Sequence, residues 1–435
     1  MNKNIEELMN FIDNSTCSYY AADTAKNILE SNGFIRLDER KKWELKKEQK
    51  YYIEKNESSI IAFVTGSGDI EEDGFRIIGS HTDSPGFKIK PNPEMEVLHN
   101  YIKLNTEVYG GPIVSTWFDR PLSIAGRVIL KGKNPLRPET RLLKVERPVV
   151  IIPNLCIHMN RNVNSGYEYN MQKDTLPLCA LNDLENKSSS KKNFLYDLIS
   201  SELKVKKEKI LDFDLFLYDT TKAEYVGAKN EFVSSGRLDD LWMFFSSLKA
   251  INNSEKTKHT KIIAAFNNEE IGSLTSQGAN SLLLYNILER IAFGFNKTKE
   301  EFKRALASSI MISADLVHAV HPNYLEKADP TNRPTLGKGP VIKSAASGSY
   351  STDGFTSAVF KGICMDIGVP CQEFVNRSDM RGGTTIGPIS ASKLNIPVID
   401  MGSPILSMHS IRELMAVKDN EYTIKAFTKF LNSNF

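Results

Sequence analysis

The chain has 435 residues, of which 41% are hydrophobic and 25% are charged, and its formal net charge at pH 7 is +2. This length predicts two domains, or one domain with a large insertion, and the composition excludes a mostly disordered chain. The near-neutral charge balance provides no field for binding nucleic acid or an anionic membrane surface.

The five cysteines form no CxxC pair and no regular ladder, which predicts free thiols in a reducing compartment. Residues 1–14 carry acidic side chains where a secretory signal would need an apolar stretch. No window approaches 18 uninterrupted apolar residues, so no transmembrane helix is expected. These features predict a cytoplasmic protein that does not interact with membranes.

The first predicted elements are two helices, at residues 4–12 and 21–34, with apolar side chains at helical spacing. The second is expected to end at Asn32-Gly33, a typical helix C-cap. Two buried strands then follow, at residues 59–66 and 75–80.

Between residues 94 and 230 the sequence changes to strand-like runs with few helices. Strands are predicted at residues 101–111, 122–130, 147–159 and 210–219, the last with apolar side chains close to period two. One helix is predicted at residues 194–205, after a polar surface loop at 181–193. We therefore predict an inserted β-rich domain at 94–230.

From Arg237 onward, helices and strands alternate. Helices are predicted at residues 237–251, 276–293 and 354–368, and strands at 260–270, 308–318 and 396–403. This alternation predicts an α/β domain, made of residues 1–93 and 231–435, with a mostly parallel sheet covered by helices on both faces.

Imidazole and carboxylate side chains follow the predicted strands of this domain or begin its first helix: His81, Asp83, Asp239, Asp240, Glu269, Glu270, Asp315 and His409. The carboxyl ends of parallel strands meet at one sheet edge, so these side chains should gather there. Such ligands suit Zn²⁺, Co²⁺ or Mn²⁺, and their number suits two ions that share a carboxylate.

The adjacent pair Glu269-Glu270 fits this hypothesis, with one glutamate on the metal and the other taking a proton from water. Each feature has a simpler interpretation when taken alone. Asp239-Asp240 could be a charged first helical turn, Asp315 a helix N-cap, and the glutamate pair a solvated surface. Only their joint placement after alternating strands favours a metal centre.

Several ordered segments resemble the signature segments of the M18 aminopeptidases, which include the aspartyl aminopeptidases: "GSHTDSPGFKIKP", "RLDDL", "NNEEIGS", "SADLVHAVHPNY", "GPVIK" and "TIGPISASKLNIPVIDMGSPILSMHSIRE". The resemblance extends over nearly the whole chain, including the β-rich block. It implies the fold of a dinuclear zinc peptidase with an inserted dimerisation domain.

The resemblance also implies a role for each matching residue. His81 and His409 would each bind one of two metal ions, Asp239 would bridge them, Glu270 and Asp315 would complete the ligand set, Asp83 would orient His81, and Glu269 would be the general base. The peptide bond after the bridging aspartate is implied to be cis.

Four further residues match substrate-contacting positions of the family: His318, Lys343, Tyr350 and, from a neighbouring subunit, His158. Simpler interpretations stand beside these. His318 could pack at a helix start, Lys343 could be a surface lysine, and His158 could be a hydrogen-bonded core histidine.

Two segments depart from the family pattern. Residues 343–350 read "KSAASGSY", with Ser-Gly-Ser before Tyr350 where the aspartyl aminopeptidases carry basic side chains. Arg381-Gly382 stands where relatives often have Pro or Ala followed by Cys. Lys343 keeps one positive charge, so we expect either an acidic or a neutral substrate preference.

The sequence therefore predicts a metallo-aminopeptidase that removes the N-terminal residue of peptides, with two divalent ions, most simply zinc. Its substrate preference is either for Asp and Glu or for a broad or neutral set of N-terminal residues. The resemblance implies homo-oligomers, with dimers assembling into a tetrahedral dodecamer. Two alternatives are a related hydrolase, such as an N-acyl amino acid deacylase, and a non-catalytic protein with structural metals. An off-metal Glu269 argues against the second.

Overall fold

The computed structural model describes residues 3–181, 193–380 and 382–434, which form two compact units. The first unit combines Met1–Asp83, Ala223–Met408 and Glu413–Phe435, and the second combines Ser84–Lys222 with the short segment His409–Arg412. The domain boundary proposed at residue 93 lies inside strand β5 (Gly86–Val97), whose pairing register shifts between Ile89 and Glu94.

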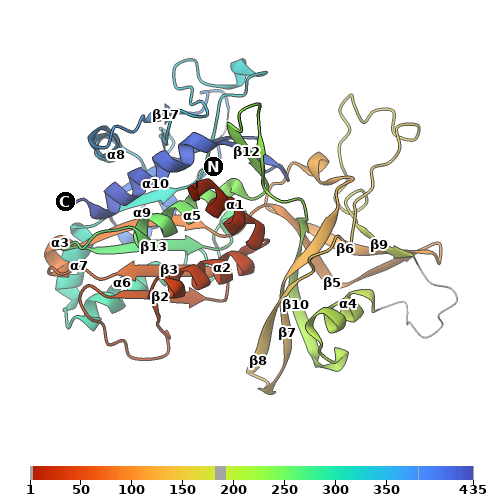
Figure 1. The fold of residues 1–435 in the computed structure, drawn as a ribbon, viewed down its shortest axis with the longest axis horizontal. Helices are drawn as coiled ribbons and strands as arrows, with labels where there is room; N and C mark the ends of the chain where they lie inside the picture. The colour runs from red at the N-terminus through yellow and green to blue at the C-terminus, as the bar shows by residue number, and fades with distance from the viewer. Residues whose placement is uncertain (1–2, 182–192, 381, 435) are drawn as a thin grey trace. The chain divides into compact units, whose positions relative to one another are not determined.

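The core of the first unit is a nine-stranded sheet (Figure 1). Its spatial order is β1 (Ile35–Arg36), β2 (Lys50–Lys55), β3 (Ser59–Val64), β13 (Thr260–Phe266), β4 (Phe75–His81), β14 (Ile310–Ala314), β18 (Val398–Gly402), β16 (Val341–Lys343) and β17 (Gln372–Phe374). The four central strands β13, β4, β14 and β18 are parallel. The predicted α/β fold with a mostly parallel sheet is confirmed.

Helices cover both faces of this sheet because its central strands are apolar on both sides. All residues of β4 are buried, and the neighbours Ile77 and Ile78 pack into two different hydrophobic clusters. One cluster includes α1 (Lys3–Asn14), α2 (Ser18–Ser31), α5 (Leu238–Asn252), α8 (Gly354–Asp366) and α10 (Val417–Asn432). The other includes α3 (Ile70–Asp73), α6 (Leu283–Gly294), α7 (Lys299–Ala307) and α9 (Ile386–Leu394).

A smaller five-stranded sheet in the same unit supports the segments that lead to the candidate site. Its order is β11 (Glu224–Val226), β12 (Phe232–Ser235), β20 (Glu413–Ala416), β19 (Pro404–Leu406) and β15 (Val317–His318). Strand β12 leads directly into α5, and β15 follows β14 along the chain.

The second unit contains a six-stranded antiparallel sheet with α4 (Phe194–Leu203). The strand order is β8 (Arg137–Lys144), β7 (Leu122–Asn134), β10 (Ile210–Asp219), β5, β6 (Tyr101–Tyr109) and β9 (Leu178–Leu181). Alternate residues of β10, such as Phe213 and Leu215, enter its apolar core. The β-rich character predicted for this part of the chain follows from that period-two pattern.

Two element predictions were wrong. Residues 147–159 form only isolated bridges at Val150 and Ile151, because Pro148 and Pro153 cannot donate ladder hydrogen bonds. The helix predicted from residue 276 begins at Leu283, after a turn in which the Ser281 hydroxyl accepts the Leu283 N–H at 3.1 Å. Most of the loop predicted at 181–193 lies outside the described residues.

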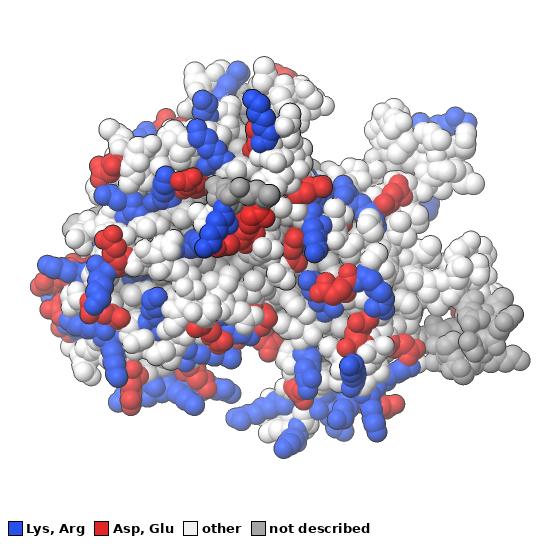
Figure 2. Space-filling view, viewed as in Figure 1, with Lys and Arg blue, Asp and Glu red and all other residues white. Residues whose placement is uncertain are grey.

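The surface carries charged side chains of both signs (Figure 2). On the face drawn in Figure 2, acidic and basic side chains are interspersed. None of the helices in the described residues combines the length and the apolar character that crossing a membrane requires.

Candidate metal centre

The carboxyl ends of four parallel strands bring the candidate site together. His81 is the last residue of β4, is 2% exposed, and lies in register with Phe266, the last residue of β13. Asp315 follows the last residue of β14, which is the other neighbour of β4. Parallel neighbours ending at one edge place these side chains side by side, as expected from the alternating pattern.

A glycine allows β18 to approach the site closely. The Asp315 N–H donates to the Met401 carbonyl at 3.0 Å, and a Cβ on Gly402 would lie 1.9 Å from the Asp315 carbonyl oxygen. Any side chain at position 402 would therefore displace the backbone that carries Asp315.

Asp239 and Asp240 occupy the turn from β12 into α5. The peptide bond between them is cis, as the resemblance implies, and neither residue has helical backbone angles. Asp240 is fully buried, and one of its carboxylate oxygens accepts the backbone N–H of His81 at 3.1 Å. The Asp239 N–H donates to the Glu413 carboxylate, also at 3.1 Å.

The acidic side chains surround the His81 ring closely enough to share a cation. Nε2 of His81 lies 3.4 Å from the Asp239 carboxylate and 4.0 Å from that of Asp315. Two groups of possible ligand atoms each lie within 4.8 Å of one another: His81 with Asp239, Asp240 and Asp315, and His81 with Glu269 and Glu270. One Asp240 oxygen is buried with no hydrogen-bond partner among the described residues. This donor set fits a zinc-type divalent ion.

Asp83 holds both the His81 ring and the glutamate pair. Nδ1 of His81 lies 3.0 Å from the Asp83 carbonyl oxygen and 3.5 Å from its carboxylate. That carboxylate also accepts the backbone N–H groups of Glu269 at 3.1 Å and Glu270 at 3.2 Å. Asp83 therefore connects the end of β4 with the 3₁₀ turn η3 (Glu269–Ile271).

The electrostatics indicate a site with an excess of negative charge. Burial, together with the negative charges of Asp315 and Glu270, raises the pKa of Glu269 to about 8. Burial also raises the pKa of Asp240 well above its ordinary value. For His81, burial lowers the pKa, but the surrounding carboxylates, Asp240 first, raise it well above its ordinary value. A bound cation would relieve this repulsion among buried carboxylates.

Three predicted substrate residues gather around one aromatic side chain in the same unit. Tyr350 and Phe374 belong to one apolar cluster, and the His318 and Phe374 ring centroids lie 6.1 Å apart. Lys343 is buried, with Nζ 3.3 Å from the Asp315 carboxylate and 5.4 Å from the centre of the Tyr350 ring. Lys343 is thus not a surface lysine. His318 and Phe374 line a cavity of about 330 Å³.

His409 and His158 belong to the second unit of the chain. His409 belongs to the second unit, where Nδ1 is 3.0 Å from the Gly111 carbonyl oxygen, and it is two residues beyond Ser407 of the first unit along the chain. His158 is exposed in an irregular segment of the second unit, so it is not a core histidine. Arg381 lies outside the described residues.

Sequence reasoning gave no role to two buried carboxylates near the site. Glu413 lies within the segment "HSIRE", yet only the contact with the Asp239 N–H indicates what it does. Asp400, on β18, accepts the Ser351 N–H and the Thr385 hydroxyl, both at 2.5 Å. Asp400 therefore anchors the segment after Tyr350. An aspartate within an otherwise apolar strand was the feature of the sequence that could have identified it.

Comparison with known proteins agrees with the resemblance. A family model described as "Aminopeptidase I zinc metalloprotease (M18)" matches residues 11–431. A probable M18 family aminopeptidase 2 of Clostridium novyi is 55% identical over 426 residues, covering 98% of each chain. A probable aspartyl aminopeptidase of Ricinus communis is 36% identical over 462 residues, covering 98% of this chain and 94% of the relative.

A solved structure extends the agreement to three dimensions. The S. cerevisiae mApe1 dodecamer superimposes with a TM-score of 0.84 at 27% identity, covering 98% of this chain and 95% of that chain. The family match, the relatives and the fold coincide over almost the entire length. The chain belongs to the M18 family of zinc metallo-aminopeptidases.

Proposed function

We propose that this enzyme removes the N-terminal residue of peptides with two divalent ions and a glutamate general base. The observation that supports this best is the convergence of His81 with five carboxylates at the carboxyl edge of the sheet, within 4.8 Å in overlapping groups. Five carboxylates and one imidazole exceed the four positions of one tetrahedral site.

His81, Asp239, Glu270, Asp315 and His409 would hold the ions. His409 enters this set through the family match and through its place a few residues after β19. When bound, the ions supply Lewis-acid polarisation of the scissile carbonyl and activation of water. Zinc is the simplest choice for imidazole and carboxylate ligands, with cobalt and manganese as alternatives.

Glu269 is the proposed proton carrier of the reaction. Its carboxylate accepts a proton from the attacking water and returns it to the leaving amine. Asp83 positions this glutamate by accepting its backbone N–H. The Glu269 side chain keeps its oxygens available for the proton because the neighbouring Glu270 supplies the ligand.

For the substrate we propose an N-terminal Asp or Glu, contacted by His318, Lys343 and Tyr350. The Ricinus relative is named a probable aspartyl aminopeptidase, which supports an acidic preference. A broad or neutral preference is the second candidate. The close pairing of Lys343 with Asp315 favours this second candidate. The Asp315 carboxylate neutralises part of the Lys343 charge, which would otherwise attract an acidic substrate side chain.

We further propose that the second unit is a dimerisation domain and that its His158 reaches the site of a neighbouring subunit. Exposed apolar side chains near His158, at Leu155, Ile157 and Met159, support a contact surface in this segment. The mApe1 relative is a dodecamer. Assembly of dimers into a dodecamer, and a cytoplasmic location, remain predictions for this chain.

A substrate panel tests these proposals. We expect kcat/KM to be highest for Asp- and Glu-nitroanilides, lower for Leu- and Lys-nitroanilides, and absent for N-acyl amino acids. The panel should be run after chelation and after the return of each metal separately. Higher activity on Leu-nitroanilide would support the neutral alternative, and activity on N-acyl amino acids alone would contradict an aminopeptidase.

A further inference from the structure

The structure assigns to Glu413 the role of a positioning residue that holds Asp239 in the orientation required for metal binding. This inference rests on the proposed metal centre, but it concerns a residue outside the ligand set. Glu413 begins β20 and is 2% exposed. Its carboxylate accepts the backbone N–H of Asp239 at 3.1 Å.

Strand pairing brings Glu413 to this position. β20 is antiparallel to β12, and Glu413 is directly opposite Ser235, the last residue of β12. Only three residues separate Ser235 from Asp239, so the Glu413 side chain reaches across the turn into α5. The contact therefore joins two segments that are far apart in the sequence, at the ends of the neighbouring strands β12 and β20.

The Asp239-Asp240 pair is thereby held from two directions. Glu413 holds the amide of Asp239, and the His81 N–H holds the carboxylate of Asp240. Since the backbone of this turn is not helical, the ordinary helical hydrogen bonds do not fix it. Fixing the amide fixes the Cα–Cβ direction of Asp239, and with it the carboxylate aimed at His81.

Burying the Glu413 carboxylate at this position costs free energy, which its hydrogen bond with Asp239 partly offsets. A buried carboxylate next to a cluster of other carboxylates is electrostatically unfavourable. A hydrogen bond from a backbone N–H to an ionised carboxylate offsets part of that cost and is short and directional. Along the chain, Glu413 also lies four residues after His409, another proposed ligand.

Three substitutions of Glu413 distinguish the effect of its side-chain length from the effect of its charge. Glu413→Gln keeps an oxygen at the same distance and removes the charge. Glu413→Asp keeps the charge but is one methylene shorter, and Glu413→Ala removes the acceptor. Glu421→Gln is the matched control, because Glu421 lies on α10 with its side chain 49% exposed and paired only with Lys425 among the described ion pairs.

The measurement is zinc affinity of the metal-free enzyme, by competition with a chromophoric chelator, together with thermal unfolding of the same metal-free samples. We expect Glu413→Asp and Glu413→Ala to lose about 10–100-fold in affinity, as for other residues that orient metal ligands, and Glu413→Gln to stay within about threefold. The control should match the wild type.

The role is wrong if the folded Asp and Ala variants bind zinc like the wild type, or if Glu413→Gln loses as much affinity as Glu413→Ala. Because zinc binding is measured without a substrate, the result is independent of the peptidase proposal. A wild type that binds zinc but cleaves no aminoacyl-nitroanilide would contradict the proposed function while leaving the Glu413 test intact.

Discussion

The two ends of the central sheet each bury a histidine, and the two histidines have opposite surroundings. His81 ends β4 among carboxylates, which raise its pKa well above the ordinary value. His259 precedes β13 at the other end, where burial, aided by the charges of Arg76 and Lys261, lowers its pKa to about 4. The same residue type, equally buried in one sheet, is therefore in an anionic environment at one edge and a cationic one at the other.

The basic edge consists of Arg76, His259 and Lys261, whose side chains donate hydrogen bonds mostly to backbone carbonyl oxygens. Nε2 of His259 donates to the Leu431 carbonyl at 2.7 Å, and Lys261 donates to the Glu255 carbonyl and, at 3.3 Å, to the Asn432 side chain. Arg76 donates to the Ser308 carbonyl at 3.1 Å and to the Ser433 carbonyl at 3.4 Å. Several of these oxygens belong to the end of α10, where positive charge is favoured.

The acidic edge has no comparable compensation among the residues that the structure describes. Lys343 pairs with Asp315, but Asp240 and Glu269 keep raised pKa values under the influence of burial and of neighbouring carboxylates. A charged edge that backbone groups satisfy is structural, whereas an edge with excess buried charge of one sign indicates a ligand of the other sign. The following predictions test this contrast, from the largest expected effect to the smallest.

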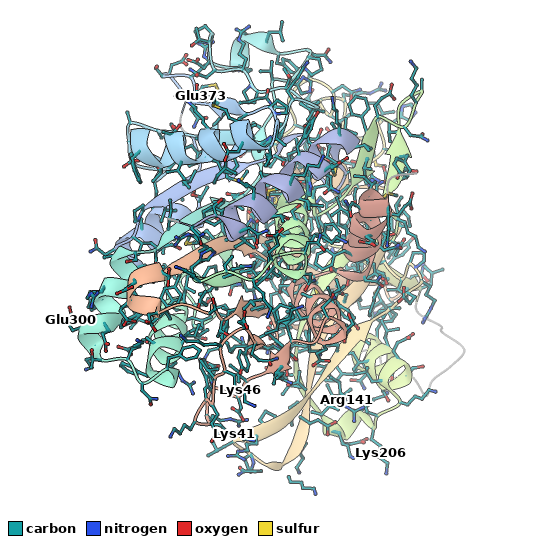
Figure 3. All side chains as sticks on the ribbon, turned by 60° about the vertical axis from the view of Figure 1, so that its left-hand side comes forward. Lys41, Lys46, Arg141, Lys206, Glu300 and Glu373 are labelled. Atoms are coloured by element: carbon teal, nitrogen blue, oxygen red, sulfur yellow. The ribbon has the colours of Figure 1, made fainter. Side chains whose placement is uncertain are left out.

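Glu269→Gln should lower kcat by about 10²–10⁴-fold, because it removes the proposed proton acceptor from the acidic edge. Metal content should stay at the wild-type level, since Glu270 is the proposed ligand. Steady-state kinetics on aminoacyl-nitroanilides and elemental analysis of one preparation measure both. Glu300→Gln, at the exposed start of α7 (Figure 3), is the control and should leave kcat unchanged. Full activity in the Glu269→Gln variant with both ions bound would rule out the assigned base.

Asp83→Asn should lower kcat/KM by about tenfold or somewhat more, the usual scale for residues that orient metal ligands. Asparagine offers one oxygen where Asp83 uses two for the amides of Glu269 and Glu270. Most of the bound metal should remain. His81→Ala should instead lose a metal ion, so equal metal loss in both variants would contradict the distinction between holding the site and ligating the metal.

The lowered pKa of His259 predicts that the folded protein loses stability in acid. The pKa is 6.5 when unfolded and about 4 when folded, so the unfolded chain takes up the proton first as the pH falls. Stability contributed by neutral His259 is therefore present above pH 6.5 and is lost toward pH 4, by about 2 kcal/mol between pH 7 and pH 5. Urea unfolding of the wild type and His259→Gln at both pH values measures it. Identical pH dependence in the two proteins would refute the assignment.

Lys261→Gln should have the smallest effect. It removes a buried charge but leaves an amide that can still donate to the nearby oxygens, so we expect a loss of about 1 kcal/mol in unfolding free energy. The kcat/KM value should not change, because this lysine lies at the structural edge. A large loss of activity without unfolding would show that the two edges are coupled.

Much of the acidic edge follows from the order of elements in the sequence. His81, Glu269 and Asp315 come directly after apolar strands, and parallel strands must end at one edge. The same rule predicted the central sheet, since β4, β13 and β14 each contain a short apolar run and are buried along their whole length.

Contacts between distant segments were not predictable in this way. The hydrogen bond from Asp239 to Glu413 spans 174 positions of the chain and depends on the pairing of β12 with β20, and short strands of four residues carry little periodicity. The strand predicted at residues 147–159 failed for a local reason, because its prolines interrupt the ladder. The burial of Lys343 against Asp315 likewise required the packed structure.

Titration of the metal-free enzyme with zinc tests the central claim most directly. Aminopeptidase activity and bound zinc should be followed in the same samples, with Asp-nitroanilide as the substrate. The account predicts no activity without metal and a rise that reaches its plateau when two zinc ions per subunit are bound. Full activity in the metal-free enzyme, or a plateau at one ion per subunit, would contradict it.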